Sequence, residues 1–139
     1  MQKVLGSFEK VSFPEFGLKG VIAKVDTGAL SGALHATDIR VVVKPGGKKV
    51  LKFRPYGRKT EVSMSDFRRK SVRASSGEME RRYLISTEIV IGVEKYPISI
   101  TLKDRTPMKK GVLIGRRFLR NNGFLVDSRQ GTKYRFHLK

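Results

Sequence analysis

The stretch VIAKVDTGA, residues 21–29, carries the strongest structural signal in the chain. A mostly apolar run leads straight into the triplet Asp26-Thr27-Gly28. An apolar run that ends in turn residues predicts a strand followed by a tight turn. A carboxylate at this place is held on rigid backbone and still reaches the edge of a sheet. The triplet alone is weak evidence of function, because aspartate and glycine are ordinary turn residues.

A second segment, GVLIGRRFL at residues 111–119, has a related organisation. Its apolar run ends at Gly115, and residues 116–121 have the composition of a short helix. The helix is expected to end at Asn122-Gly123, since both residue types suit a left-handed C-cap. This is the one helix that the sequence predicts.

In the rest of the chain, turn residues separate short runs that are either apolar or alternate between apolar and polar residues. Such a pattern predicts an all-β barrel or sandwich. Residues 54–70 are polar and basic, and we expect them to form a surface loop. The predicted strands are residues 4–13, 18–25, 33–43, 49–53, 71–74, 83–91, 96–102, 112–114, 124–127 and 134–138.

The composition suits one compact domain over residues 1–139, with 39% hydrophobic residues and no linker or repeat. Cysteine is absent, which excludes disulfides, thiolate metal sites and a thiol nucleophile. No apolar stretch is long enough to span a membrane, and the first residues lack the apolar segment of a secretory signal. We therefore expect a cytoplasmic protein with no membrane contact.

The chain is strongly basic, with 30 Lys and Arg against 12 Asp and Glu and a formal net charge of +18. A field of this size steers a protein toward polyanions or acidic proteins. The basic residues gather at 48–59, 68–73, 109–120 and 129–139, with aromatic residues among them. This interleaving suits nucleic-acid binding, and half-buried strands produce the same alternation. Both interpretations stay open.

Together, the two quoted segments resemble the retropepsins. In that family an Asp-Thr-Gly turn lies near the start of the chain, and an apolar segment ending in Gly-Arg braces it from behind. Residues 70–82, KSVRASSGEMERR, match the position of the retropepsin flap, and the strands after it follow in the same order. The resemblance implies a closed all-β barrel with one short C-terminal helix, acting as a homodimer.

The chain is still more similar to a bacterial retropepsin-like family formerly called ATP-dependent zinc proteases. The resemblance rests on the Asp-Thr-Gly-Ala turn, on Leu34-His35-Ala36 and on residues 73–77, RASSG. Residues 102–105, LKDR, also match that family. Its members are associated with a ligase that adds glutamates to a ribosomal protein. The resemblance therefore implies a protein or peptide substrate that is acidic or ribosome-associated.

The resemblance assigns the catalytic role to Asp26 and supporting roles to its neighbours and to the bracing segment. Peptide hydrolysis by carboxylates needs one group as base and another as proton donor. Asp127 also ends an apolar strand, but no glycine follows it and arginine lies nearby, so it is a poor second carboxylate. A twofold dimer supplies the partner as a second copy of Asp26. The supporting residues are Thr27, Gly28, Ala29, Leu113, Ile114, Gly115 and Arg116, and the flap residues are Ser75, Ser76 and Gly77.

The sequence departs from both relatives at Leu30, where viral retropepsins have an aspartate that meets the arginine of the Gly-Arg segment. The partner of Arg116 is therefore open, and Asp104 is the candidate replacement.

A zinc site is one alternative to a peptidase. His35 and Asp38 are three residues apart in a predicted strand, which places them on opposite faces, and His137 is the second histidine of the chain. No HExxH helix exists. We expect His35 to be structural, and we expect neither a metal nor a cofactor.

The stronger alternative is a non-catalytic basic module that binds RNA, the ribosome or acidic proteins, with Asp26 only a turn residue. That hypothesis explains the charge of +18 directly. It is compatible with peptidase activity, because a basic surface also recruits acidic substrates.

Overall fold

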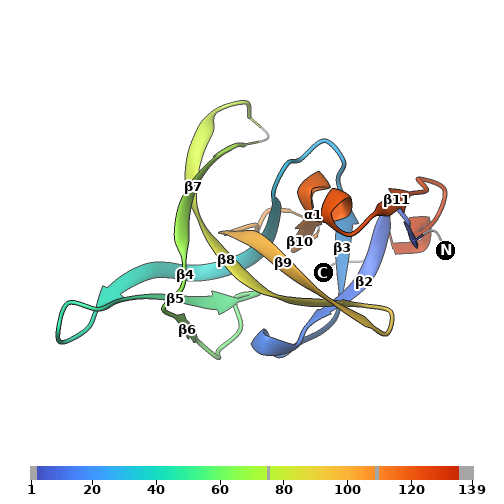
Figure 1. Cartoon of the computed structure of the whole chain (residues 1–139). Coiled ribbons are helices and arrows are strands. Elements are labelled where there is room, and N and C mark those ends of the chain that lie inside the picture. Colours follow the sequence, from blue (N-terminus) through green and yellow to red (C-terminus); the bar gives the residue numbers. More distant parts are fainter. Residues whose placement is uncertain (1–2, 75, 109, 135–139) are drawn as a thin grey trace.

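The computed structural model describes residues 3–74, 76–108 and 110–134, and most of them lie in strands (Figure 1). The first half contains β1 (Lys3–Leu5), β2 (Phe8–Phe13), a 3₁₀ turn η1 (Pro14–Phe16), β3 (Leu18–Val25), β4 (Gly32–Val43), β5 (Lys49–Pro55) and β6 (Val62–Met64). The second half contains β7 (Arg68–Arg73), β8 (Met79–Ile91), β9 (Glu94–Lys103), β10 (Val112–Ile114), helix α1 (Arg116–Asn121), β11 (Phe124–Val126) and a second 3₁₀ turn, η2 (Thr132–Tyr134).

The main sheet is a ring of strands with two extensions. Its strands follow the order β10-β3-β2-β8-β9-β4, and β4 pairs in turn with β10, which joins the two ends. The ring is only partly closed, because β2 and β8 are paired at two positions only, Val11↔Ile91 and Ser12↔Val90. The strands β5 and β6 extend the sheet beyond β4, and β7 pairs with the outer part of β8. The all-β fold with a retropepsin-like barrel and one short helix is confirmed.

The core lies inside this ring and explains why the predicted strands form. In β3, Val21, Ala23 and Val25 are buried on one side of the strand, and exposed Lys24 points the other way, on the side where Ile22 is also buried. Phe13, Phe53 and Ile100 are fully buried at the centre. Because β3, β4 and β10 all contribute to this core, the turn after β3 is anchored on packed elements.

The ends of the described chain form a second, two-stranded sheet in which β1 pairs in parallel with β11. The prediction of one strand over residues 4–13 was wrong at this point. The strand ends at Leu5 and a new one begins at Phe8. Between them, the Gly6 N–H donates to the carboxylate of Glu9 at 2.7 Å. An added Cβ at Gly6 would lie 2.5 Å from the carbonyl oxygen of Gln130, so close backbone packing requires glycine there.

Two other predictions need correction. Residues 54–70 are not a loop, because they contain β6 and the start of β7. Their polar side chains lie on an edge hairpin that buries little, so the hydrophobic signal is weak. The predicted strand at 134–138 begins instead in η2 at Tyr134, and residues 135–139 lie outside the described part. Within the described residues, no helix is long and apolar enough to cross a membrane.

Candidate active site

Asp26 lies directly after the end of β3, on a turn held by its own backbone and side chain. Its N–H donates to the carbonyl oxygen of Ile114 at 2.9 Å, and its Oδ1 accepts from the Gly28 N–H at 2.9 Å. The Ala29 N–H closes the turn on the Asp26 carbonyl at 3.3 Å. Asp26 is partly exposed, and Thr27 and Gly28 are exposed. The result is a fixed carboxylate that solvent or a ligand can reach.

The predicted bracing segment contacts this turn from behind. β10 pairs in parallel with β3, and Ile114 is in register with Val25. At the start of α1, the Arg116 N–H donates to Ala29 O at 2.7 Å and the Arg117 N–H to Leu30 O at 3.1 Å. The Arg116 side chain also donates to Gly28 O at 2.9 Å. Sequence reasoning named both halves of this assembly, and the structure brings them together.

Gly115 is required by the closeness of this contact. A Cβ at this position would lie 2.7 Å from the Ser31 carbonyl carbon, 2.8 Å from Leu30 O and 3.0 Å from Ala29 O. All three atoms belong to backbone, so no side-chain rotation relieves the clash. Any larger residue must therefore displace the loop that carries the candidate carboxylate.

Arg116 has a different partner from the one the sequence suggested. Its guanidinium binds the Gly28 carbonyl, while Asp104 accepts hydrogen bonds from the Thr106 backbone and hydroxyl. No ion pair joins Arg116 to Asp104 within the described part of the chain. The hypothesis of an Arg116–Asp104 pair was wrong. A backbone carbonyl replaces the carboxylate, which is why no acidic residue is needed at Leu30.

The predicted flap is a two-stranded arm built from β7 and β8 that rises from the body of the molecule (Figure 1). At its tip the Gly77 N–H donates to Ala74 O at 2.9 Å, and the Arg73 guanidinium donates to Gly77 O at 2.8 Å. Ser76 and Gly77 are exposed at this tip, and Ser75 lies outside the described residues. The arm has the hairpin form that the sequence predicted.

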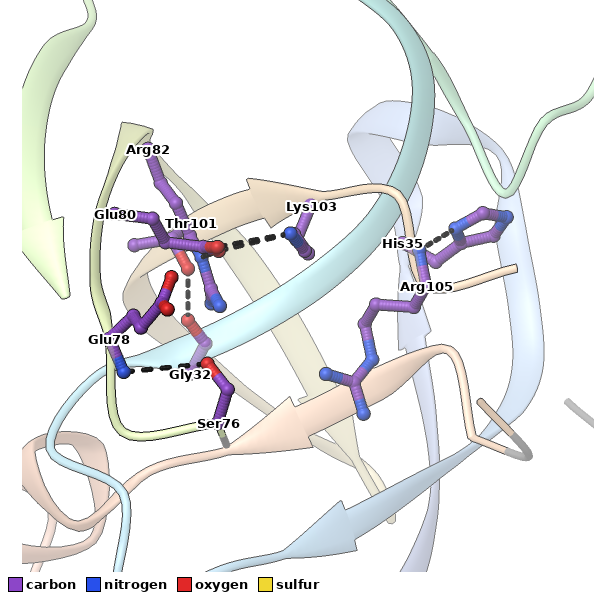
Figure 2. A network of polar contacts seen from close by, with 9 residues as sticks. All are labelled: Gly32, His35, Ser76, Glu78, Glu80, Arg82, Thr101, Lys103 and Arg105. Atoms are coloured by element: carbon purple, nitrogen blue, oxygen red, sulfur yellow. Dashed lines mark hydrogen bonds and ion pairs between the residues drawn. The ribbon is translucent and has the colours of Figure 1, made fainter. Parts of the chain in front are cut away.

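Sequence reasoning missed a group of cationic side chains beside this site, at the facing ends of β8 and β9. Glu80 binds Arg82 at 2.6 Å and Lys103 at 3.1 Å (Figure 2). The hydrogen bonds from these two cations lower the pKa of the Glu80 carboxyl. One carboxylate thus neutralises only part of the group. The sequence contained a signal for this group, because side chains alternate between the two faces of a predicted hairpin. That alternation places Arg82 on the same face as Lys70 and Glu80.

Arg105 connects this cationic group to Asp26. Burial and the positive charge of Arg82 lower the pKa of the Arg105 guanidinium, while the negative charge of Asp26 acts in the opposite direction. The Arg105 Nε donates to Lys110 O at 3.0 Å, which fixes the side chain. Arg105 is therefore a held cation within electrostatic range of both the candidate carboxylate and the arm.

Positive charges also lie near one another between the arm and α1, where Lys70 on β7 is within electrostatic range of Arg117. Burial, followed by the charges of Arg117 and Arg68, lowers the pKa of Lys70 on β7. Since Lys70 pairs with Arg82 across the hairpin, this face of the arm presents positive charge toward the turn and α1.

His35 has a structural role in this arrangement, as the sequence suggested. Its Nδ1 accepts the backbone N–H of Arg105 at 2.9 Å and lies 3.8 Å from Asp104 Oδ1. Its ring packs edge-on against Tyr56, with centroids 5.8 Å apart. His35 thereby positions the loop that carries Arg105 (Figure 2). The described residues contain no group of three or more His, Cys, Asp or Glu side chains arranged to hold a metal ion.

Known proteins are similar to this chain in sequence. The chain is 30% identical over 129 residues to a probable alpha-L-glutamate ligase of Shewanella halifaxensis, covering 89% of this chain and 28% of that protein. A protein of the same description from Parasynechococcus marenigrum is 35% identical over 120 residues, covering 81% and 25%. The chain thus spans about a quarter of the length of these relatives.

A solved structure supports the fold alone. The protein Lpg0085 of Legionella pneumophila, of unknown function, superposes with a TM-score of 0.71 at 24% identity, covering 93% of this chain and 95% of that one. A family model described as the retropepsin-like aspartic endopeptidase RimB matches residues 4–134, which include the Asp26 turn, the arm and the bracing segment. This chain belongs to the RimB-like family of retropepsin-like aspartic endopeptidases.

Proposed function

We propose that the protein is an aspartic endopeptidase in which the Asp26 carboxylates of two identical subunits activate one water molecule. The observation that carries this proposal is the turn itself. Asp26 is partly exposed, hydrogen-bonded to Gly28 and braced from behind by Ile114 and Arg116. Preorganised polar groups of this kind are what catalysis of a charged transition state requires.

The need for a dimer follows because the described residues offer no second suitable carboxylate. Asp127 also ends an apolar strand, but hydrogen bonds from Arg129 lower its pKa to about 2. A group of this acidity stays ionised and cannot deliver a proton at ordinary pH. A twofold axis beside the turn provides the missing group as the partner's copy of Asp26.

In such a pair the two carboxylates share one proton, the behaviour established for aspartic proteases in general. The ionised group takes a proton from water, and the protonated one donates to the substrate carbonyl. Thr27 is assigned to hydrogen bonding across the axis, and Gly28 to close approach of the substrate backbone. Ala29, Leu113, Ile114, Gly115 and Arg116 support the turn. Ser76 and Gly77, with Ser75, are assigned to closure over the substrate.

We assign acidic peptides as the substrate class. Arg105 lies within electrostatic range of Asp26 and Arg82, and Lys70 pairs with Arg82 across the hairpin. Arg82 and Lys103 both bind Glu80, the one carboxylate that forms an ion pair with these four cations in the described part. Peptide carboxylates replace the solvent around these cations and gain charge-assisted hydrogen bonds. The relatives support the assignment, because they are named as ligases of glutamate, an acidic residue.

The decisive experiment compares Asp26→Asn with the unchanged protein on a glutamate-rich peptide. Asp26→Asn is isosteric, so we expect an unchanged melting temperature and complete loss of cleavage. Asp66→Asn, an exposed substitution of the same kind, is the control and keeps its activity. EDTA leaves the activity unchanged because no metal takes part. Cleavage by Asp26→Asn at the rate of the unchanged protein would refute the proposal.

Subunit mixing tests the shared site separately. An excess of Asp26→Asn chains converts active homodimers into mixed dimers with one remaining carboxylate. Activity per unchanged chain then falls toward zero as the excess grows. A constant activity per unchanged chain, or a sedimentation pattern of monomers at catalytic concentrations, contradicts the dimer.

A further inference from the structure

The face of the β7–β8 arm that points away from the Asp26 turn is exposed and strongly basic. The register pairs Arg69 with Tyr83, Ser71 with Arg81 and Arg73 with Met79, so these residues share one face. Lys70, Glu80 and Arg82 occupy the other face, toward the site. We name the outer set Arg69, Ser71, Arg73, Met79 and Arg81 the outer flap face. All five are exposed, and Tyr83 lies half-buried at its base.

The outer flap face is cationic without compensating acid. It contains three arginines, and alternation along β8 puts Glu80 on the opposite face. Glu78 lies beside Glu80 on that opposite side (Figure 2). Within the described arm, no carboxylate is paired with Arg69, Arg73 or Arg81. A solvated face usually mixes both charge signs, whereas this one presents a single sign.

The three guanidinium groups have different degrees of restraint. Arg69 lies over the Tyr83 ring at 4.7 Å and donates to its hydroxyl at 3.3 Å. Arg73 gives one donor to Gly77 O and keeps the others. The Arg81 side chain makes no hydrogen bond or ion pair to other described residues. Each arginine therefore retains free donors, and one is held over an aromatic ring.

The spacing of the arginines is regular. Each cross-strand pair on this face carries one arginine, and successive pairs are two residues apart. Two residues of a strand span about 6.6 Å. This step is close to the separation of neighbouring phosphates along an extended nucleic-acid strand. Arginine binds phosphate bidentately, and an arginine–aromatic pair at the base provides a surface on which a base stacks.

We propose that the outer flap face binds the phosphate backbone of single-stranded nucleic acid, at a site separate from Asp26. The face contains arginine and not lysine, which favours phosphate over the carboxylates of an acidic peptide. Contacts to phosphate carry no sequence information, so binding is independent of base sequence and accepts RNA and DNA alike.

The test measures fluorescence anisotropy of a labelled 12-nucleotide RNA, and of DNA of the same sequence, with the full chain over a range of salt. The variant Arg69→Gln/Arg81→Gln leaves the Arg73 contact at the tip in place. Each lost phosphate contact reduces the log–log salt slope by about 0.7. We expect the slope to fall by about 1.4, and affinity at physiological salt by at least about tenfold. Lys44→Gln/Lys48→Gln, on the exposed β4–β5 turn, removes the same charge and changes affinity by less than about twofold.

Several results would overturn the proposal. One is an equal loss in the two double variants, which indicates only net charge. Another is absence of RNA and DNA binding at physiological salt. A third is that poly-L-glutamate displaces the RNA and that its own binding is weakened as much as RNA binding by the Arg69 and Arg81 substitutions. That result would make the face a site for acidic peptides. The single variant Arg81→Gln, whose side chain has no described contact, separates binding from folding and lowers the slope by about 0.7. Asp26→Asn retains binding, so failure here and failure of the peptidase proposal are distinct.

Discussion

The Arg116 guanidinium donates a hydrogen bond to the Gly28 carbonyl oxygen at 2.9 Å, from the first turn of α1 to the middle of the Asp26 turn. The backbone of the same residue binds Ala29 O. One residue thus fixes two consecutive carbonyls of the turn, and β10 fixes Asp26 itself through Ile114 O. The position of the carboxylate depends on this brace.

The variant Arg116→Ala removes the side-chain bond and keeps the backbone bond. We expect kcat to fall about tenfold, which corresponds to about 1.4 kcal/mol. The free energy of unfolding changes by less than about 1 kcal/mol, because the side chain is partly exposed. Peptidase kinetics and urea unfolding measure the two quantities. Arg120→Ala, on the exposed side of the same helix, is the control. Equal kinetic losses in the two variants would show that Arg116 acts only through the stability of α1.

The variant Gly115→Ala places a methyl group against three backbone atoms of residues 29–31. Overpacking against rigid atoms costs about 1–3 kcal/mol, and the turn must move to accept it. We expect lower stability in urea together with loss of most activity. Gly46→Ala is the matched control, because Gly46 has φ +89° and open space around it. That variant loses about 1 kcal/mol through backbone strain alone and remains active. Retention of full activity in Gly115→Ala contradicts a tight brace.

The turn and the brace were predictable because their signals are local. The run before Asp26 and the run before Gly115 have strand periodicity and end in turn residues, and the structure confirms strands at 18–25 and 112–114 and the helix at 116–121. The family resemblance then gave their relative placement, which periodicity alone does not contain.

The features that sequence reasoning missed depend on contacts between distant segments. Arg105 lies within electrostatic range of Asp26, and His35, on β4, holds its backbone. Arg116 needs no carboxylate partner, because the backbone carbonyl of Gly28, a group that every residue has, accepts its hydrogen bond. The edge strand β6 was missed because it buries little apolar surface. In each case the deciding partner leaves no local pattern in the chain.

The variant Arg105→Gln tests the cationic approach to the site. Loss of this charge weakens the attraction for peptide carboxylates near Asp26. The preference for acidic peptides is the kcat/KM for a glutamate peptide divided by the kcat/KM for the matching glutamine peptide. We expect this ratio to fall about tenfold, mainly because the KM for the glutamate peptide rises. Lys95→Gln, at an exposed position near the start of β9, removes the same charge far from the site along that strand and leaves the ratio unchanged. An equal fall in both variants would assign the preference to net charge.

The variant Tyr56→Phe tests a buried hydroxyl beside the Arg105 loop. The Tyr56 side chain is buried, and its hydroxyl has no hydrogen-bond partner in the described structure. Burying an unpaired hydroxyl costs about 1–3 kcal/mol. Removing it while keeping the ring is therefore expected to leave the free energy of unfolding unchanged or to raise it by about 1 kcal/mol at pH 7.

The same variant changes the stability at alkaline pH, and the sign follows from the pKa. Burial raises the pKa of Tyr56 to about 12, from 10.0. A group whose pKa is higher in the folded state adds stability below its unfolded pKa, and this stability is lost as pH rises from 10 through about 12. Tyr56→Phe removes that loss, so its unfolding free energy falls less over this window than that of the unchanged protein. Tyr83→Phe, whose hydroxyl accepts from Arg69, is the control and keeps the alkaline loss. Parallel pH profiles for Tyr56→Phe and the unchanged protein would show that the Tyr56 hydroxyl is accessible to water in solution.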